Sequence, residues 1–251
     1  MQQNRVDTAV DLDFLTGNTN RHVVWFNQAI CGSQEAAQRE DTQHKVQLHH
    51  QVIEPLRKLQ LKAEKAGFEL RIVSGYRSFE RQLYIWNSKL GGTRPVLDDA
   101  GNVADLQVMD DWQKVQSVLR WSALPGASRH HWGTDLDIYD AASLKEGYRL
   151  QLTPEEVEPG GIQAPFHDWL DVQLGSNGCF FRPYVKDKGG IAPERWHLSY
   201  RPVADLYEKT LTPELLRHFL EEKFSDGGSM LMLDVVLDHF DEIFRRFVAV
   251  N

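Results

Sequence analysis

The chain has 251 residues, of which 41% are hydrophobic and 25% charged, a balance that argues against a largely disordered protein. Its formal net charge is -8, and its lysines and arginines form no cluster, so the concentrated basic surface of a nucleic-acid-binding protein is excluded. Its only two cysteines, Cys31 and Cys179, lie far apart in the sequence, which excludes a disulfide-rich scaffold.

Neither a signal peptide nor a membrane-spanning segment is predicted. Asp7, Asp11 and Asp13 interrupt the region in which a signal peptide would need a continuous apolar run. The most apolar stretch, residues 230–237, is broken by Asp234 and is too short to cross a bilayer. We therefore expect a cytoplasmic protein that has neither a membrane nor a nucleic acid as its partner.

In chain order, the first half begins with a polar, irregular segment, residues 1–44, in which Trp25 and Phe26 are the side chains expected to dock on the core. Residues 69–73 alternate between apolar and polar and predict a half-buried strand. Apolar residues at helical spacing predict helices over three segments, namely 44–66, 79–90 and 110–121.

The second half contains two predicted strands, 134–139 and 195–200, and a predicted helix over 165–174. Beyond Pro202 the chain is predicted to be helical, and its apolar residues between 230 and 247 recur three or four positions apart. That spacing fits a partner-binding seam or, as we expect, an amphipathic helix packed on its own domain. Because strands and helices do not alternate regularly, the pattern favours an α+β fold.

A short segment between residues 128 and 137 combines residue types that bind metal ions. Asp135 and Asp137 stand two apart on a predicted strand, so their carboxylates project from the same face. Gly133 allows a tight turn that would bring His130 back over this strand. One imidazole and one carboxylate are ligands that zinc accepts.

A second segment, Glu194-Arg195-Trp196-His197, can complete the site. His197 would be the third ligand, and Glu194 would stand near the metal without binding it. Three protein ligands leave one coordination position open, which is the arrangement of a catalytic zinc site. Each of these residues also has an ordinary explanation as a surface or packed side chain.

Together the segments resemble the motifs of zinc D-alanyl-D-alanine carboxypeptidases related to the vancomycin-resistance peptidases, in a superfamily that includes lysostaphin-type peptidases and the hedgehog domain. The family pattern Ser-x-His-x-x-Gly-x-Ala-x-Asp is matched by Ser128, His130, Gly133 and Asp137. The pattern Glu-x-x-His is matched by Glu194 and His197. The pattern Ser-Gly-Tyr-Arg-Ser-x-x-x-Gln is matched by Ser74, Gly75, Tyr76, Arg77, Ser78 and Gln82.

The resemblance implies a role for each matched residue. The ligands of Zn²⁺ would be His130, Asp137 and His197. Glu194 would be the general base and later the proton donor. The substrate would be bound by Arg77, Gln82 and Ser128. The planar guanidinium of Arg77 would bind the free terminal carboxylate, which would make the enzyme an exopeptidase.

Asp135 departs from the family pattern, which often has alanine at that position. Its carboxylate could orient a ligand histidine or compete with Asp137 for the metal. In the same way, His131 is the alternative to His130. Trp132 and Trp196 are expected to form walls of the site.

The resemblance also implies a fold, namely a small antiparallel sheet that carries the zinc site and is flanked by helices. The expected organisation is an N-terminal extension packed on the core, a zinc peptidase domain and a helical C-terminal extension within the same globule, over residues 1–44, 45–202 and 203–251 respectively.

The implied activity is removal of the terminal D-alanine from peptidoglycan stem peptides or muropeptides. A cytoplasmic enzyme that trimmed pentapeptides would attack the cell's own wall precursors, so we expect an L,D-carboxypeptidase that acts on tetrapeptides in cell-wall recycling. The alternatives are a D,D-carboxypeptidase on pentapeptides, a wall-lytic endopeptidase, and a zinc-containing binding module with little catalysis.

Overall fold

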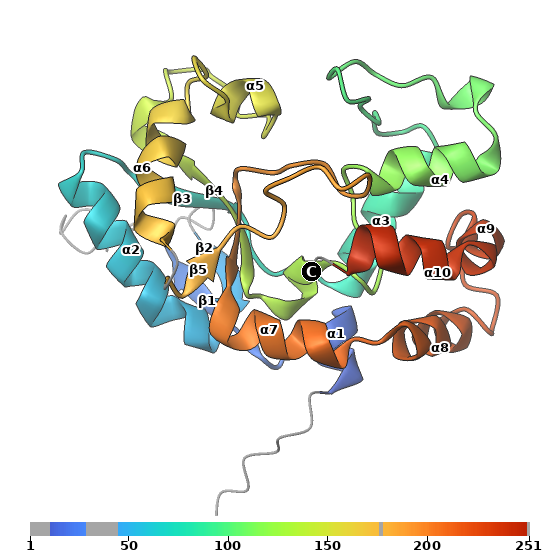
Figure 1. Ribbon diagram of the computed structural model, residues 1–251. Coiled ribbons are helices and arrows are strands. Elements are labelled where there is room, and N and C mark those ends of the chain that lie inside the picture. Colours follow the sequence, from blue (N-terminus) through green and yellow to red (C-terminus); the bar gives the residue numbers. More distant parts are fainter. Residues whose placement is uncertain (1–10, 29–44, 176–177, 250–251) are drawn as a thin grey trace, which may run out of the picture.

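The computed structural model describes residues 11–28, 45–175 and 178–249 (Figure 1). Its main sheet is four-stranded and antiparallel, in the order β3-β4-β6-β5, and a separate ribbon pairs β1 with β2. The strands are β1 Val23–Asn27, β2 Lys45–His49, β3 Leu70–Ser74, β4 Asp135–Asp140, β5 Phe180–Phe181 and β6 His197–Tyr200.

Helices pack around the sheet, with α2 and α6 to its left in Figure 1 and with α3, α4 and α8 to α10 to its right. The α-helices are α1 Leu12–Thr16, α2 Ile53–Lys65, α3 Phe79–Leu90, α4 Asp111–Leu119, α5 Pro154–Val157, α6 Ala164–Leu174, α7 Arg201–Thr210, α8 Pro213–Lys223, α9 Leu233–Asp238 and α10 Phe240–Ile243. The structure thus has the α+β architecture and the helical C-terminal region that the sequence predicts.

Strand β4 divides its side chains between two environments. Leu136 and Ile138 are buried in an apolar core that includes Leu56 of α2 and Leu170 of α6. Burial of one such side chain contributes roughly 1.5–3 kcal/mol. The alternate residues, among them Asp137, therefore project from the opposite face, where acidic groups can gather without entering the apolar core.

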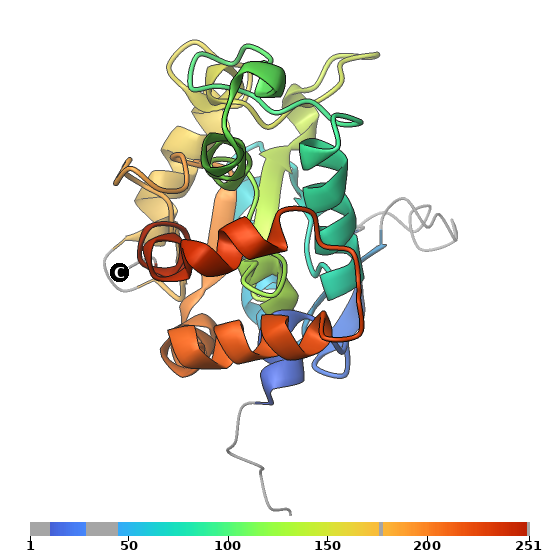
Figure 2. The same cartoon turned by 90° about the vertical axis from the view of Figure 1, so that its right-hand side faces the viewer.

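The C-terminal helices complete a second apolar core with α1, α3 and α4. Trp86 of α3 is fully buried, and its Nε1 donates a hydrogen bond of 3.0 Å to the carbonyl oxygen of Leu231. Val236, Phe240 and Phe247 are buried in the same core, and Figure 2 shows α8 to α10 side by side across this face. The tail therefore packs on its own chain, which is the expected one of the two alternatives that its spacing allows.

The helix predicted over 44–66 is wrong at its start. Residues Lys45–His49 form strand β2, a short 3-10 turn follows, and the α-helix begins only at Ile53. The reason is a distant partner, because β1 pairs with β2 along its whole length, with Phe26 opposite Val46. Helical spacing of apolar residues in one segment contains no information about a strand that pairs with it from elsewhere in the chain.

The N-terminal segment has more structure than its polar composition predicts. It contains α1, which Asp11 caps by accepting a hydrogen bond from the Asp13 N–H, and strand β1. Phe26 docks on the core as expected, with 2% of its surface exposed, but Trp25 is 67% exposed and does not. Adjacent residues of a strand face opposite sides, so the face of the ribbon that buries Phe26 leaves Trp25 on the other, exposed face. Cys31 lies outside the described residues, and Cys179 is exposed.

Among the described residues, no helix combines the length and the apolar character needed to cross a lipid bilayer.

Candidate active site

The register of the main sheet brings two of the predicted ligands together. Asp137 of β4 lies directly opposite His197 of β6. His130 comes from the 3-10 turn Arg129–Trp132, which ends at Gly133 with a φ of 66°. A Cβ atom on Gly133 would lie 2.5 Å from Val23 Cγ1, so this turn requires glycine both for its backbone conformation and for space.

His130, Asp137 and His197 form a buried group whose ligand atoms all lie within 4.8 Å of one another. His130 Nε2 is 3.3 Å from Asp137 Oδ2, and His197 Nδ1 is 3.4 Å from Asp137 Oδ1. Ligand atoms about 2 Å from a tetrahedral ion lie roughly 3.3 Å apart. The spacing and the donor types of the group therefore fit a zinc ion.

Each histidine has one ring nitrogen occupied by another partner. His130 Nδ1 lies 2.8 Å from the carbonyl oxygen of Gly75, and His197 Nε2 lies 2.9 Å from Asp135 Oδ1. These contacts leave His130 Nε2 and His197 Nδ1 as the nitrogens that face Asp137. Such a partner on the far nitrogen sets the tautomer and the ring orientation of a metal-binding histidine.

The charges around His197 favour a cation at this position. Burial alone would lower the pKa of His197, but hydrogen bonds to Asp135 and Glu194 and the charges of Asp135 and Asp137 raise it to about 10. Burial alone would raise the pKa of Asp137, but His130, His197 and Arg77 lower it. A field that binds a proton so firmly also stabilises a metal cation at the same atoms.

Asp135 stands behind the metal group rather than in it. Its Oδ1 accepts hydrogen bonds from His197 Nε2 and from Arg129 Nε, the latter at 2.8 Å, and its Oδ2 accepts one from Ser199 Oγ at 3.1 Å. Arg129 also donates a 2.9 Å hydrogen bond to Glu208 of α7. Of the two roles open to Asp135, the structure therefore favours orientation of a ligand histidine.

His131 is excluded as the alternative ligand by its contacts. Its Nδ1 lies 2.7 Å from the carbonyl oxygen of Arg77, and its Nε2 accepts a 3.2 Å hydrogen bond from the N–H of Gly126. Burial lowers the pKa of His131 to about 3, so the ring is neutral. Both of its nitrogens are occupied away from the metal group, which leaves His130 as the ligand from this pair.

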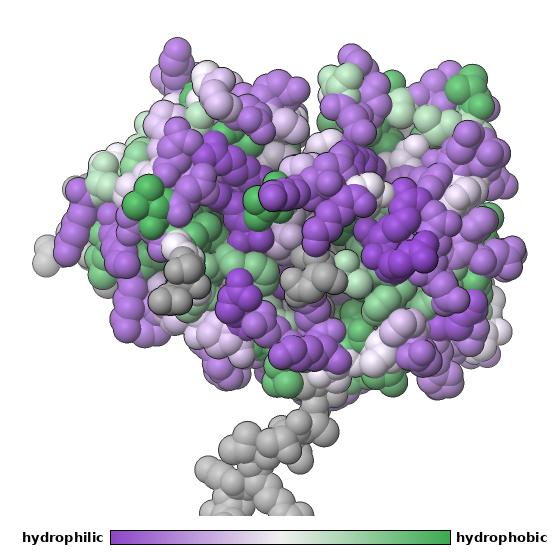
Figure 3. All heavy atoms as spheres, viewed as in Figure 1, coloured by the Kyte–Doolittle hydropathy of each residue, from purple (hydrophilic) through white to green (hydrophobic). Residues whose placement is uncertain are grey.

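The metal group opens into a cavity of about 390 Å³. Its rim is formed by residues 151–153 before α5 and by Pro95 and Leu97 on the other side, and Figure 3 shows the surface hollowed between these two regions at the top of the view. The predicted site residues that line the cavity are Arg77, Ser128, His130, Asp137, Glu194, Trp196 and His197. Glu194 Oε2 lies 3.3 Å from His197 Nδ1, beside the metal group as predicted.

Gln82 holds Arg77 instead of lining the cavity. Its Oε1 accepts a 2.8 Å hydrogen bond from Arg77 Nη1, and its Nε2 donates one of 2.6 Å to the carbonyl oxygen of Ala123. Ser74 Oγ accepts from Arg77 Nη2 at 3.1 Å. Gln82 is fully buried and does not line the cavity, and its predicted direct contact with a substrate stays a prediction. Its amide oxygen accepts from Arg77 and its amide nitrogen donates to Ala123, so both ends of the amide serve to orient Arg77.

Trp132 also differs from its predicted position. It is buried, its Nε1 donates a 3.2 Å hydrogen bond to the carbonyl oxygen of Leu15, and the guanidinium of Arg129 lies 4.6 Å from its ring centroid. It therefore packs against the guanidinium of Arg129 and does not line the cavity. Only Trp196 of the predicted pair lines the cavity.

Lys89, Trp121 and Tyr184 also line the cavity, and sequence reasoning missed them. The ring of Tyr184 meets that of His197 edge-on, with centroids 5.0 Å apart. Lys89 Nζ donates a 2.7 Å hydrogen bond to Ser122 Oγ. Lys89 follows Gln82 by about two helical turns and so shares its helix face, which is the one sequence signal that could have found it.

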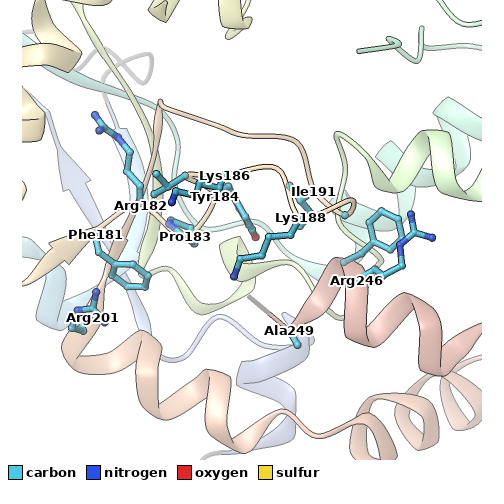
Figure 4. A pocket seen from close by; sticks show the side chains of 13 residues that line it. Phe181, Arg182, Pro183, Tyr184, Lys186, Lys188, Ile191, Arg201, Arg246 and Ala249 are labelled. Atoms are coloured by element: carbon cyan, nitrogen blue, oxygen red, sulfur yellow. The ribbon is translucent and has the colours of Figure 1, made fainter. Parts of the chain in front are cut away.

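A second hollow, of about 330 Å³, lies on the other side of the loop that precedes Glu194 (Figure 4). It contains several cationic side chains, but three of them have anionic partners: Arg182 pairs with Asp171, Arg201 with Asp205, and Arg246 with Glu242. No member of the metal group lines it. Of these two hollows, only the first contains the metal group.

Comparison with protein families supports this reading of the site. A protein-family model described as VanY, D-alanyl-D-alanine carboxypeptidase, matches residues 45–203, which is the greater part of the chain and includes all of the metal group.

Three curated proteins show the range of similarity. An uncharacterised protein of Haemophilus influenzae is 53% identical over 77 residues, a match that covers 31% of this chain and 53% of that protein. A second uncharacterised Haemophilus influenzae protein is 33% identical over 128 residues, covering 50% of this chain and 93% of that protein. The putative carboxypeptidase YodJ of Bacillus subtilis is 28% identical over 141 residues, covering 55% of this chain and 40% of that protein. The chain thus spans about half the length of the first of these relatives.

Two solved structures are similar at lower identity. VanYB in complex with D-alanine-D-alanine is 21% identical, with a TM-score of 0.46 over 73% of this chain and 87% of that chain. The LD-carboxypeptidase LdcB is 22% identical, with a TM-score of 0.46 over 81% and 79%.

Proposed function

The chain belongs to the VanY family of D-alanyl-D-alanine carboxypeptidases, and from this premise we propose that it is a zinc-dependent carboxypeptidase that removes the terminal D-alanine of peptidoglycan stem peptides. One observation carries the proposal. A single cavity joins the metal group, the carboxylate of Glu194 and the guanidinium of Arg77. These are the parts that hydrolysis of a C-terminal peptide bond needs.

His130, Asp137 and His197 would hold the zinc ion through the atoms that face one another in the structure. Zinc, when bound, supplies a Lewis acid that polarises a carbonyl group and lowers the pKa of water. Glu194 lies beside the metal group at the edge of the cavity, where its carboxylate can take a proton from the attacking water. It then returns this proton to the leaving amine, so no covalent intermediate is needed.

Arg77 binds the free carboxylate of the substrate in this proposal. Burial lowers its pKa, opposed by the charges of Asp137 and Glu194, and its guanidinium is held on one side by Gln82 and Ser74. The remaining N–H groups are free to donate to an anion. An internal peptide bond has no carboxylate at this point, which is why the arrangement favours an exopeptidase over a wall-lytic endopeptidase.

The finer part of the proposal concerns which bond is cut. We propose cleavage of the L,D bond of tetrapeptides, in the cytoplasm and in recycling of wall fragments, because a cytoplasmic enzyme that trimmed pentapeptides would destroy wall precursors. The second candidate is cleavage of the D,D bond of pentapeptides, which the description of the matching family favours. Both bonds end in a D-alanine whose carboxylate would meet the same Arg77.

Mass spectrometry of zinc-loaded protein incubated separately with muropeptide tetrapeptide and pentapeptide tests both candidates. We expect loss of one D-alanine from the tetrapeptide. Loss from the pentapeptide alone would establish the D,D candidate instead. Glu194→Gln is the matched control, because it keeps the size of the side chain and removes the base. It should retain zinc while its turnover falls by about 10²- to 10⁴-fold. If neither peptide changes, the carboxypeptidase proposal is wrong, and a zinc-containing binding module takes its place.

A further inference from the structure

Among the described residues, two cations that line the cavity, Arg77 and Lys89, form no salt bridge, although Glu194 lies near enough for its charge to act on both. The hydrogen bonds of Arg77 go to the uncharged side chains of Gln82 and Ser74, and that of Lys89 goes to the hydroxyl of Ser122. Both side chains line the same cavity as the metal group. Arginines of the second hollow, by contrast, pair with nearby carboxylates, as Arg246 does with Glu242.

The two cations are anchored, one directly and one through Gln82, to two consecutive residues. Ser122 accepts the hydrogen bond of Lys89, and the next residue, Ala123, accepts that of Gln82, which in turn holds Arg77. After these contacts, Lys89 keeps two of its three N–H donors, and Arg77 keeps three of its five. A carboxylate has two oxygens that can accept several such donors at once.

The size of the leaving group restricts which carboxylate can reach this pair. In a terminal amino acid a single carbon separates the amine nitrogen from the carboxylate. Glu194, which protonates that nitrogen in the proposed reaction, is close enough to act on the charges of both Arg77 and Lys89. A terminal carboxylate within reach of Glu194 and Arg77 therefore lies inside the cavity that Lys89 also lines.

We propose that Lys89 binds the terminal carboxylate of the substrate together with Arg77, as a second specificity-determining cation. This inference rests on the proposed carboxypeptidase function and deepens it. Lys89 thereby helps to select substrates that end in a free acid over those that end in an amide or continue as a chain.

The state of Lys89 agrees with this role. Burial lowers its pKa to about 8, Arg94 acts in the same direction, and Glu194 opposes them. Lys89 is thus charged at neutral pH but poorly stabilised before the substrate binds. An incoming carboxylate replaces the lost hydration and adds a charge-assisted hydrogen bond.

The test compares steady-state kinetics on two synthetic stem peptides that differ only in their last group, a free D-alanine or D-alaninamide. The enzymes are the zinc-loaded wild type, Lys89→Met, Lys89→Arg and the control Lys58→Met, which removes an exposed lysine from α2. We expect Lys89→Met to raise KM for the free acid roughly 10- to 100-fold. Its kcat and its KM for the amide should change little, Lys89→Arg should recover much of the loss, and Lys58→Met should match the wild type.

Product inhibition gives an independent readout, since free D-alanine carries the same carboxylate. Its inhibition constant should weaken in Lys89→Met by about the same factor as KM. A wild-type enzyme that discriminates acid from amide while Lys89→Met does so equally well would overturn the role of Lys89 and leave the proposed function standing. A wild type that cleaves neither peptide would overturn both.

Discussion

The two walls of the cavity are built in different ways. The metal wall consists of residues fixed by backbone geometry, with Asp137 and His197 paired across β4 and β6. The carboxylate-binding wall consists of two long side chains, Arg77 and Lys89, which hydrogen bonds to neighbouring groups hold in place. Strand register sets the first wall, while the second depends on individual polar contacts. Loss of one residue from the metal wall should therefore abolish metal binding and activity. Loss of one residue from the carboxylate-binding wall should only weaken substrate binding.

The largest effect is expected from Asp137→Ala, which removes the metal-binding carboxylate that contacts both His130 and His197. Metal content after dialysis, measured by mass spectrometry, should fall far below one ion per chain. The value of kcat/KM should drop by about 10³-fold or more, since the metal supplies several kcal/mol of transition-state stabilisation. The control Tyr139→Phe, two residues further along the same strand, should keep its metal content and its kcat/KM. Full metal content in Asp137→Ala would show that the metal wall is wrongly assigned.

The next largest effect concerns the group behind the metal wall. Asp135→Asn leaves the buried guanidinium of Arg129 without its main partner, which is expected to cost about 3–5 kcal/mol of unfolding free energy. It also removes the carboxylate behind His197, and zinc affinity should weaken roughly 10- to 100-fold. Urea unfolding without metal and zinc titration measure the two effects separately.

A double variant separates these two effects of Asp135. Arg129→Met combined with Asp135→Asn removes the unpaired charge, so it should recover most of the unfolding free energy but not the zinc affinity. Recovery of both would mean that Asp135 acts on the metal site only through the stability of the fold.

Substitutions in the carboxylate-binding wall should have smaller effects on activity. Arg77→Lys keeps the charge but loses the planar fork that Gln82 and Ser74 orient, so kcat/KM for a free-acid peptide should fall roughly 10- to 100-fold. The zinc content should stay unchanged, in contrast to Asp137→Ala. Loss of zinc from Arg77→Lys would show that the two walls are not independent.

The same difference explains how far the sequence could predict the site. The metal group could be predicted because its residues have fixed spacing within short motifs, and the structure brings all three of its members together. Asp135 could be placed on the correct face from its position on a strand, but its pairing with Arg129 depends on a turn and a helix from elsewhere in the chain. Those tertiary contacts have no counterpart in local spacing.

Outside the site, prediction from the sequence also succeeds where the deciding contacts are local and fails where they come from distant segments. Helix α3 was predicted at its true bounds, because one apolar face and the cap at Ser78 are local features. Strand β2 was missed because its partner, β1, lies in a segment that looked irregular. Lys89 carries no motif, and its place in the cavity depends on residues from elsewhere in the chain, such as Ser122.

The smallest expected effect is a change of KM with pH that belongs to the carboxylate-binding wall alone. Burial, Arg94 and Arg77 lower the pKa of Lys89 to about 8, and Glu194 is the nearby charge that opposes them. A substrate carboxylate binds the protonated amine, so affinity is complete below about pH 8 and is lost as the pH rises through that value. KM for a free-acid peptide should therefore rise severalfold between roughly pH 7 and 9.5 in the wild type. Lys89→Arg stays charged over this range and should show no such rise, whereas an identical rise in both enzymes would assign the effect to another group.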